Sequence, residues 1–456
     1  MKGIAMHKEN KMGTMPVGKL LFTMALPMII AMVVQALYNV VDSIYVSRIS
    51  ESAVTALSLA FPVQNILIGF ATGIGVGVNS LLSKSLGEHN REAANRSAGN
   101  GIFLLLIATA AFILFGLFGA RPYFEIQSSV QETVDGGAIY TAICCIGSLG
   151  IFVEVLGERL LQSSGRTFYT LITQGTGAVI NILLDPVFIF GVEPLGIPAM
   201  GIAGAAVATV IGQWVAAILA VIFNLKCNPD VQFGTEYIKP AKAALVPILT
   251  VGIPSIIMMA IGSVMNFGMN QILQGFNETA TGVFGIYFKL QSFFFMPLFG
   301  INNATISIVA YNYGARNPKR ITGTLIRATA SALAIMVAGL LIFQFFPDLL
   351  LGIFNPSDEF LRIGRSALRI ISLCFPFAAF GIALSASFQA LGDGIYSTIT
   401  SICRQMLALL PAAYLLSLTG EVTNVWWAFP IAECVSFCVT AILFARIYRR
   451  KIKPLQ

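Results

Sequence analysis

Long apolar segments recur along this chain of 456 residues, and short polar stretches separate them. A helix that crosses the hydrocarbon core of a bilayer needs about 20 mostly apolar residues. A closed barrel would need alternating apolar and polar residues, and runs such as Gly101–Phe118 do not alternate. We therefore predict an all-α membrane protein with twelve transmembrane helices. They lie at about 20–46, 53–83, 97–120, 136–161, 168–191, 199–224, 245–275, 281–311, 325–346, 364–390, 395–418 and 425–447.

The scarcity of charge supports this prediction. Charged residues make up 11% of the chain and hydrophobic residues 56%, whereas a soluble globular protein carries about 25% charged residues. This composition excludes a soluble enzyme, a nucleic-acid-binding protein and a disordered scaffold. The seven Cys show no disulfide spacing, and both His lie in polar segments, so we expect no His-based metal site in the membrane. No GxxxxGK[ST] sequence occurs, so we expect no ATP hydrolysis.

Basic residues predict the orientation. With the N-terminus inside, 22 of the 28 Lys and Arg fall in inner segments and five in outer segments. This bias predicts a multi-pass protein of the inner (cytoplasmic) membrane with both termini in the cytoplasm. Four Lys precede the first apolar run and no small-residue cleavage site follows it, so we expect a retained helix rather than a signal peptide.

The second half of the chain repeats the first at a constant offset of 227 residues. The offset carries Pro27 to Pro254, Ser80 to Ser307 and Gly87 to Gly314. Because each half then holds an even number of helices, the two six-helix bundles are related by a parallel repeat, an architecture of secondary transporters. We predict an N-terminal segment at 1–19, a bundle at 20–224, a linker at 225–244, a second bundle at 245–447 and a tail at 448–456.

Acidic residues inside the spans indicate a functional site, because buried charges are costly and usually face a cavity. On the first helix, helical spacing places one polar stripe on a single face: Gln35, Tyr38, Asn39 and Asp42. Asp185 on the fifth helix lies four residues after Asn181 and directly before Pro186. Two carboxylates at similar depth favour a proton or Na⁺ site. The alternative is that each is a satisfied polar residue near a helix end.

Two further acids, Glu154 and Glu158, are spaced four residues apart beside Arg159 on the fourth helix. They indicate either a structural charge cluster or a relay. The second half keeps polar residues but has no carboxylate at the position of Asp42. Lys289 in the eighth helix either lines the cavity or extends to the outer surface, and Glu433 is its candidate partner. The remaining candidates for a substrate cavity are amides: Gln64, Asn65, Asn266, Asn270 and Gln291.

Several segments, in order, resemble the MATE (multidrug and toxic compound extrusion) family, most closely its bacterial MepA-like branch. They include LPMIIAMVVQALYNVVDSIYVSRI (26–49), ERLLQSSGRTFYT (158–170), TGAVINILLDPVFIFG (176–191) and SFQALGDGIYS (387–397). The resemblance implies twelve helices in two lobes and export of organic cations and drugs in exchange for H⁺ or Na⁺. It implies no other cofactor.

The resemblance also implies a coupling-ion site in the first bundle at Asp42, Asp185 and Asn181. Glu158 stands where some members have an amide, which adds a carboxylate to that site. We expect a functional monomer in the lipid bilayer with no catalytic residues. Two alternatives stay open: a lipid-linked oligosaccharide flippase of a related superfamily, and an intramembrane enzyme. The absence of a His cluster argues against the enzyme, and the few cations in the spans argue against the flippase.

Overall fold

The computed structural model describes residues 10–192, 194, 196–354 and 357–456, without the side chains of residues 39, 40, 43, 47 and 51. Within this part of the chain the structure is helical, and one isolated bridge joins Val192 to Ile197. The first half contains α1 (Lys11–Thr14), α2 (Val17–Ser47), α3 (Glu51–Gly87), α4 (Arg91–Leu114), the π-helical turn η1 (Phe115–Gly119), α5 (Ala120–Gln127), α6 (Gln131–Ile146), α7 (Leu149–Ser163), α8 (Thr167–Phe190), α9 (Ile202–Cys227) and α10 (Thr235–Ile238).

The second half repeats the order of long helices. It contains α11 (Lys242–Gln274), α12 (Glu278–Gly314), α13 (Pro318–Phe345), α14 (Pro347–Gly352), α15 (Asp358–Ser372), α16 (Phe375–Ala390), α17 (Gly394–Ile402), η3 (Cys403–Leu409), α18 (Leu410–Ser417), α19 (Val422–Val425), α20 (Ala428–Ile447), η4 (Tyr448–Ile452) and η5 (Lys453–Leu455).

The predicted spans are confirmed. Among the described residues, ten helical segments are long and apolar enough to cross a membrane, and two bent helix pairs bring the number to twelve. The bent pairs are α6 with α7, at 46°, and α15 with α16, at 47°. The fourth and tenth windows, predicted as single runs, are therefore each broken into two helices.

The helix ends show the internal repeat. Adding 227 to the bounds of α3 gives those of α12, and the same shift carries the first residues of α4 and α8 to those of α13 and α17. Both turns after the second span of a half contain a residue with positive φ, His89 at 55° and Arg316 at 52°. Asn90 and Asn317 then cap the next helix, each accepting a hydrogen bond from the backbone N–H three residues on. Thus the parallel repeat is a property of the backbone as well as of the sequence.

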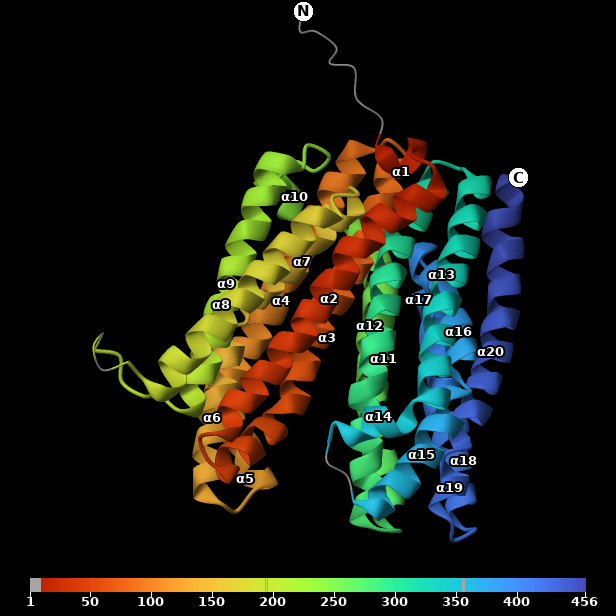
Figure 1. The fold of residues 1–456 in the computed structure, drawn as a ribbon. Coiled ribbons are helices and arrows are strands. Elements are labelled where there is room, and N and C mark those ends of the chain that lie inside the picture. The colour runs from red at the N-terminus through yellow and green to blue at the C-terminus, as the bar shows by residue number, and fades with distance from the viewer. Residues whose placement is uncertain (1–9, 193, 195, 355–356) are drawn as a thin grey trace, which may run out of the picture.

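The two halves form bundles that lie side by side (Figure 1). Contacts between them are made mainly by α3 with α11, α2 with α12 and α3 with α12. Helix α1 and the C-terminal end of the chain lie at the same end of the molecule, called here the terminal end, and the bundles diverge toward the opposite end (Figure 1). This arrangement confirms the predicted fold class.

An aromatic core fills the second bundle. Phe284 lies between Trp426 and Tyr287, with ring centres 6.5 Å away on each side, and Phe343 packs against Phe375 at 5.3 Å. Large buried aromatic side chains contribute strongly to packing. The core of this bundle is therefore largely aromatic.

The linker between the bundles is fastened to the first one. Asn100 on α4 donates through Nδ2 to the carbonyl of Tyr237 (3.2 Å) and accepts through Oδ1 from the N–H of Ala241 (2.8 Å). Asn95 accepts from the N–H of Gln232 (2.8 Å). These bonds hold the linker against the terminal end of α4.

Candidate functional site

The two acids predicted to form an ion site, Asp42 and Asp185, lie in one bundle on helices that pack together, α2 and α8. Asp185 is fully buried, and Asp42 is close enough to interact with it electrostatically. Asn181, one turn before Asp185, is also buried and donates through Nδ2 to Asp185 Oδ1 (3.4 Å) and to Thr209 Oγ1 of α9 (3.3 Å). Asn181 and Asp185, four residues apart in the sequence, thus lie in one polar cluster.

This cluster holds three buried oxygens without a protein donor. Asp42 Oδ1, Asp185 Oδ2 and Asn181 Oδ1 have no hydrogen-bond partner among the described residues. Leaving a buried carboxylate oxygen unsatisfied is costly. A proton would satisfy one carboxylate, and carboxylate and amide oxygens are also the ligands that a small hard cation prefers.

A proline in α2 links this helix to α8. Pro27 cannot donate to the carbonyl of Thr23 one turn earlier, so that carbonyl is free. Thr167 at the start of α8 donates its hydroxyl to it (3.5 Å). In the second half, Pro254 likewise frees the carbonyl of Thr250, and the equivalent of Thr167 is Gly394, which has no hydroxyl. In the second bundle the hydroxyl contact at the proline differs, since Thr398 of α17 donates to the carbonyl of Pro254 itself (3.0 Å).

Tyr38 connects the ion cluster to the rest of the polar stripe. Its hydroxyl hydrogen-bonds Gln35, and it lies within electrostatic range of Asp42, Asp185 and Glu154. Gln64 on α3 donates to the Tyr140 hydroxyl (2.7 Å), and its neighbour Asn65 is half-buried. The predicted candidate Asn39 has a side chain outside the described set.

Glu158 lies in a separate environment. It is 3% exposed and accepts from Thr173 Oγ1 (2.8 Å) and Gln174 Nε2 (2.9 Å), both on α8. The neighbouring Arg159 donates to Gln162 Oε1 (2.9 Å). Glu154 interacts electrostatically with Glu158 and with Tyr38. The structure thus brings Asp42, Asp185 and Asn181 into one cluster. Glu158 lies apart from it and is connected to it electrostatically through Glu154 and Tyr38.

The candidates of the second half are dispersed. Asn266, Asn270 and Gln291 are half-buried, and Lys289 is exposed. The predicted pairing of Lys289 with Glu433 is wrong. Glu433 pairs with Arg404, at 3.0 Å from Oε1 to Nη1. Arg404 lies in the π-helical turn η3, and the extra residue in such a turn changes which side chains of a helix face its neighbours.

A polar seal between the bundles was not predicted from the sequence. Asn79 Oδ1 on α3 accepts from the hydroxyls of Ser163 on α7 (2.8 Å) and Ser307 on α12 (3.0 Å). Ser80 donates to the carbonyl of Gln389 on α16 (2.8 Å). Ser80 and Ser307 are equivalent in the repeat, and both make hydrogen bonds to the other half of the chain.

The short helix α1 also bridges the bundles. The carbonyl of Met12 accepts from Asn312 Nδ2 (3.1 Å) and Arg320 Nη2 (2.9 Å) in the second half. Asn10, which caps α1, donates to the carbonyl of Ser164 in the first half (3.3 Å). The sequence indicated that this segment is basic, but it did not indicate that the segment would bridge the two bundles.

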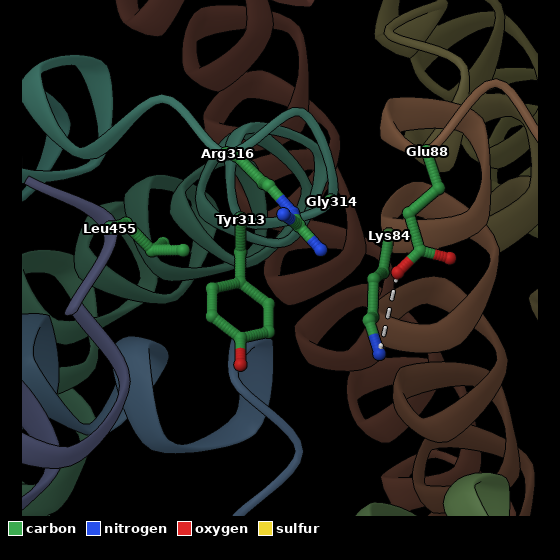
Figure 2. Close-up of a pocket in the computed structure, with 6 residues that line it drawn as sticks. All are labelled: Lys84, Glu88, Tyr313, Gly314, Arg316 and Leu455. Carbon is green, nitrogen blue, oxygen red and sulfur yellow. Dashed lines mark ion pairs between the residues drawn. The ribbon is translucent and has the colours of Figure 1, made fainter.

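A cavity of about 430 Å³ opens beside the seal, between the end of α3 and the turn after α12 (Figure 2). Lys84 pairs with Glu88 (3.6 Å) and lies 5.8 Å from the ring centre of Tyr313. Arg316 extends toward Lys84 from the other side (Figure 2). At the terminal end these polar contacts accompany a buried apolar cluster that α2 and α12 share.

The sequence and the fold of this chain are similar to those of known proteins. The MatE family model matches residues 27–187 and again 254–415, which together cover most of the chain and follow the internal repeat. A multidrug export protein MepA of Staphylococcus saprophyticus is 23% identical over 94% of this chain and 93% of its own length. An FAD transporter of Shewanella oneidensis is 23% identical over 95% of each chain.

A solved structure is similar throughout. It is described as the outward-facing conformation of a multidrug resistance MATE family transporter of the MOP superfamily, and it superposes with a TM-score of 0.90. It is 26% identical and covers 98% of both chains.

Proposed function

Because the chain belongs to the MATE family of membrane transporters, we propose that it exports drugs and organic cations in exchange for H⁺ or Na⁺ by alternating access. The observation that carries this proposal is the set of unpartnered buried oxygens on Asp42, Asp185 and Asn181. Such atoms, on two helices of one bundle, are suited to bind an ion reversibly.

The described conformation supports the direction of exchange. The bundles are joined at the terminal end by α1 and the polar seal, and they diverge at the other end (Figure 1). We assign the terminal end to the cytoplasm, because the basic residues concentrate there. In this proposal the conformation faces outward, which is the state described for one of the solved relatives.

In the proposed cycle, a proton or Na⁺ enters from outside and binds between Asp42 and Asp185. Binding neutralises the mutual repulsion of the carboxylates and changes how α2 packs on α8. A cationic substrate loses its carboxylate partner and is released outward. The polar candidates for orienting the substrate are those chosen from the sequence: Gln35, Tyr38, Asn39, Gln64, Asn65, Asn266, Asn270, Lys289 and Gln291.

Glu158 takes a supporting part in this proposal. Its two donors on α8 hold it in place, and Glu154 and Tyr38 connect it electrostatically to the ion site. A second proton bound there would change the number of ions exchanged per substrate. The protein would act as a monomer, with residues 20–224 and 245–447 as its two lobes, in the inner membrane.

A second candidate function is the export of an anionic cofactor-like molecule. The relative named as an FAD transporter is matched over nearly its whole length, and Lys289 lies exposed on a membrane-spanning helix. The same preference for an anionic group would hold for a lipid-linked oligosaccharide flippase. Transport of dye cations and of flavin nucleotides in the same vesicles separates these functions.

The central test is efflux from proteoliposomes with a pH gradient and a Na⁺ gradient imposed separately. We expect one gradient to drive dye efflux in the unmodified protein, and Asp42→Asn and Asp185→Asn to abolish that coupling. Glu92→Gln is the matched control, because Glu92 is an exposed acid paired with Arg96 at the terminal end. Full coupled efflux by both Asp variants would refute the site assignment.

A further inference from the structure

A groove of about 450 Å³ lies between the bundles on the terminal half of the molecule, and nothing in the transport cycle uses it. Its walls are α2 of the first bundle and α12 and α13 of the second. The lining is mostly apolar: on α2 it includes Phe22, which is 64% exposed, and Leu26, which is 40% exposed. On a membrane-spanning helix, exposed apolar side chains face lipid.

The groove runs lengthwise along one leaflet. Its lining on α2 extends from Gly18 to Ile29, and its lining on α13 from Arg327 to Ile335. At a rise of about 1.5 Å per residue these stretches are roughly 16 Å and 12 Å long. Half of a hydrocarbon core of about 30 Å is roughly 15 Å. The hollow therefore matches the depth of a single acyl chain.

One cation closes the terminal end of this groove. A Cβ atom at Gly18 would lie 3.5 Å from Arg327 Nε, so the guanidinium rests beside the start of α2. Arg327 Nη1 donates to the carbonyl of Gly323 (3.2 Å), and none of the ion pairs among the described residues includes Arg327. By contrast, Arg320 on the same helix is held by the carbonyls of Met12 and Met15. Arg327 is thus an exposed guanidinium with donors to spare.

We infer that this groove binds an anionic phospholipid of the leaflet at the terminal end, with its phosphate on Arg327 and one acyl chain between α2 and α13. The apolar groove fits the acyl chain of such a lipid, and the cation at its end, at the membrane boundary, fits the phosphate. The positive charge disfavours an organic cation, which separates this site from the substrate pathway. Because its walls come from both bundles, the bound lipid would stabilise their contact at the terminal end.

Native mass spectrometry of the full chain in detergent tests this inference. The protein should retain phosphatidylglycerol in the mass spectrum. In a separate thermal-unfolding measurement, phosphatidylglycerol should raise the melting temperature of the protein more than phosphatidylcholine does. Arg327→Ala should weaken phosphatidylglycerol binding roughly fivefold or more, since a basic residue near an anionic lipid contributes about 1 kcal/mol. Arg327→Lys should preserve most of it. Ala330→Phe, which places a large side chain in the groove, should displace the lipid while leaving Arg327 in place.

Arg450→Ala is the matched control, because Arg450 is a basic residue of η4 at the same end of the molecule and outside the groove. It should leave phosphatidylglycerol binding unchanged. Equal binding of both lipids, unchanged binding in Arg327→Ala, or an equal stabilisation by inorganic phosphate alone would overturn the inference.

Discussion

Gly87 and Gly314 occupy equivalent positions in the two halves, and each packs against a backbone carbonyl of the other half. A Cβ atom at Gly87 would collide with the carbonyl of Tyr311, and one at Gly314 with the carbonyl of Lys84. Lys84 and Tyr311 are themselves equivalent in the repeat. The pseudo-twofold axis of the molecule thus passes through the closest contact between α3 and α12.

We expect Gly87→Ala or Gly314→Ala to prevent this contact from closing. Since backbone atoms cannot move aside as a flexible side chain does, the added methyl group would hold the terminal end apart. Dye efflux should fall severalfold, and a water-soluble thiol reagent should reach a Ser307→Cys variant from that end. Gly285→Ala on the same helix as Gly314 is the control, because a Cβ atom there meets nothing within 4 Å. Normal efflux by both Gly87→Ala and Gly314→Ala would show that this contact is dispensable.

Removing Asn181 should weaken ion binding. Asn181→Ala deletes an unpartnered oxygen and the donor that orients Asp185, so the apparent affinity for the coupling ion should fall roughly tenfold or more. Thr209→Val removes only the contact with the Asn181 amide and should have a smaller effect. Initial rates of efflux against ion concentration measure both. Equal effects of the two substitutions would contradict a coordinating part for the Asn181 oxygen.

Docking of α1 should depend on pH through Lys11. Burial, and then the charge of Arg166, lower the pKa of the Lys11 ammonium below 10.5. The docked segment therefore holds its proton less tightly than a free segment, and docking strengthens as the pH rises from the lowered pKa toward 10.5. A fluorophore on a Thr14→Cys variant should become less mobile as the pH rises toward 10.5. Lys11→Met should abolish this change; its persistence would assign it to another group.

Breaking the pair of Arg404 and Glu433 should destabilise the second bundle. Glu433→Gln leaves a guanidinium without its carboxylate, and because Arg404 is 29% exposed, we expect a loss of about 1–3 kcal/mol rather than the full value for a buried pair. Replacing both residues by Met should restore part of the stability, because an apolar pair needs no partner. Thermal unfolding in detergent measures both. A single variant as stable as the unmodified protein would show that water already screens the pair.

Much of the fold could be predicted because lipid imposes a simple rule on sequence. The presence of α3 and α12 follows from apolar length and from the repeat, although both helices extend a few residues beyond the predicted 53–83 and 281–311. Asp42 and Asp185 were chosen as candidates because a charge in lipid is costly. Rotational phase was not predictable in the same way. The η3 turn changes which residues of its helix face α20, so Glu433 meets Arg404 instead of Lys289.

The seal and the bridging helix α1 escaped prediction for another reason. Ser, Asn and backbone carbonyls are common in any helix, and only the relative placement of the bundles makes Asn79 and Ser307 partners. Glu158 shows the same limit. Its type and position suggested an ion ligand, whereas its environment depends on Thr173 and Gln174, two residues of α8 that carry no charge.

The linker has a mechanical consequence. Since Asn95 and Asn100 fasten it to α4 as far as Ala241, it belongs to the first bundle as a rigid body. The covalent pivot between the two moving parts is then confined to the single peptide that joins Ala241 to the first residue of α11. If one lobe rotates relative to the other, the backbone torsions would change mainly at that joint, and the contacts of α1 would have to rearrange. The two lobes would therefore move about a short, defined hinge rather than at the ends of a flexible linker.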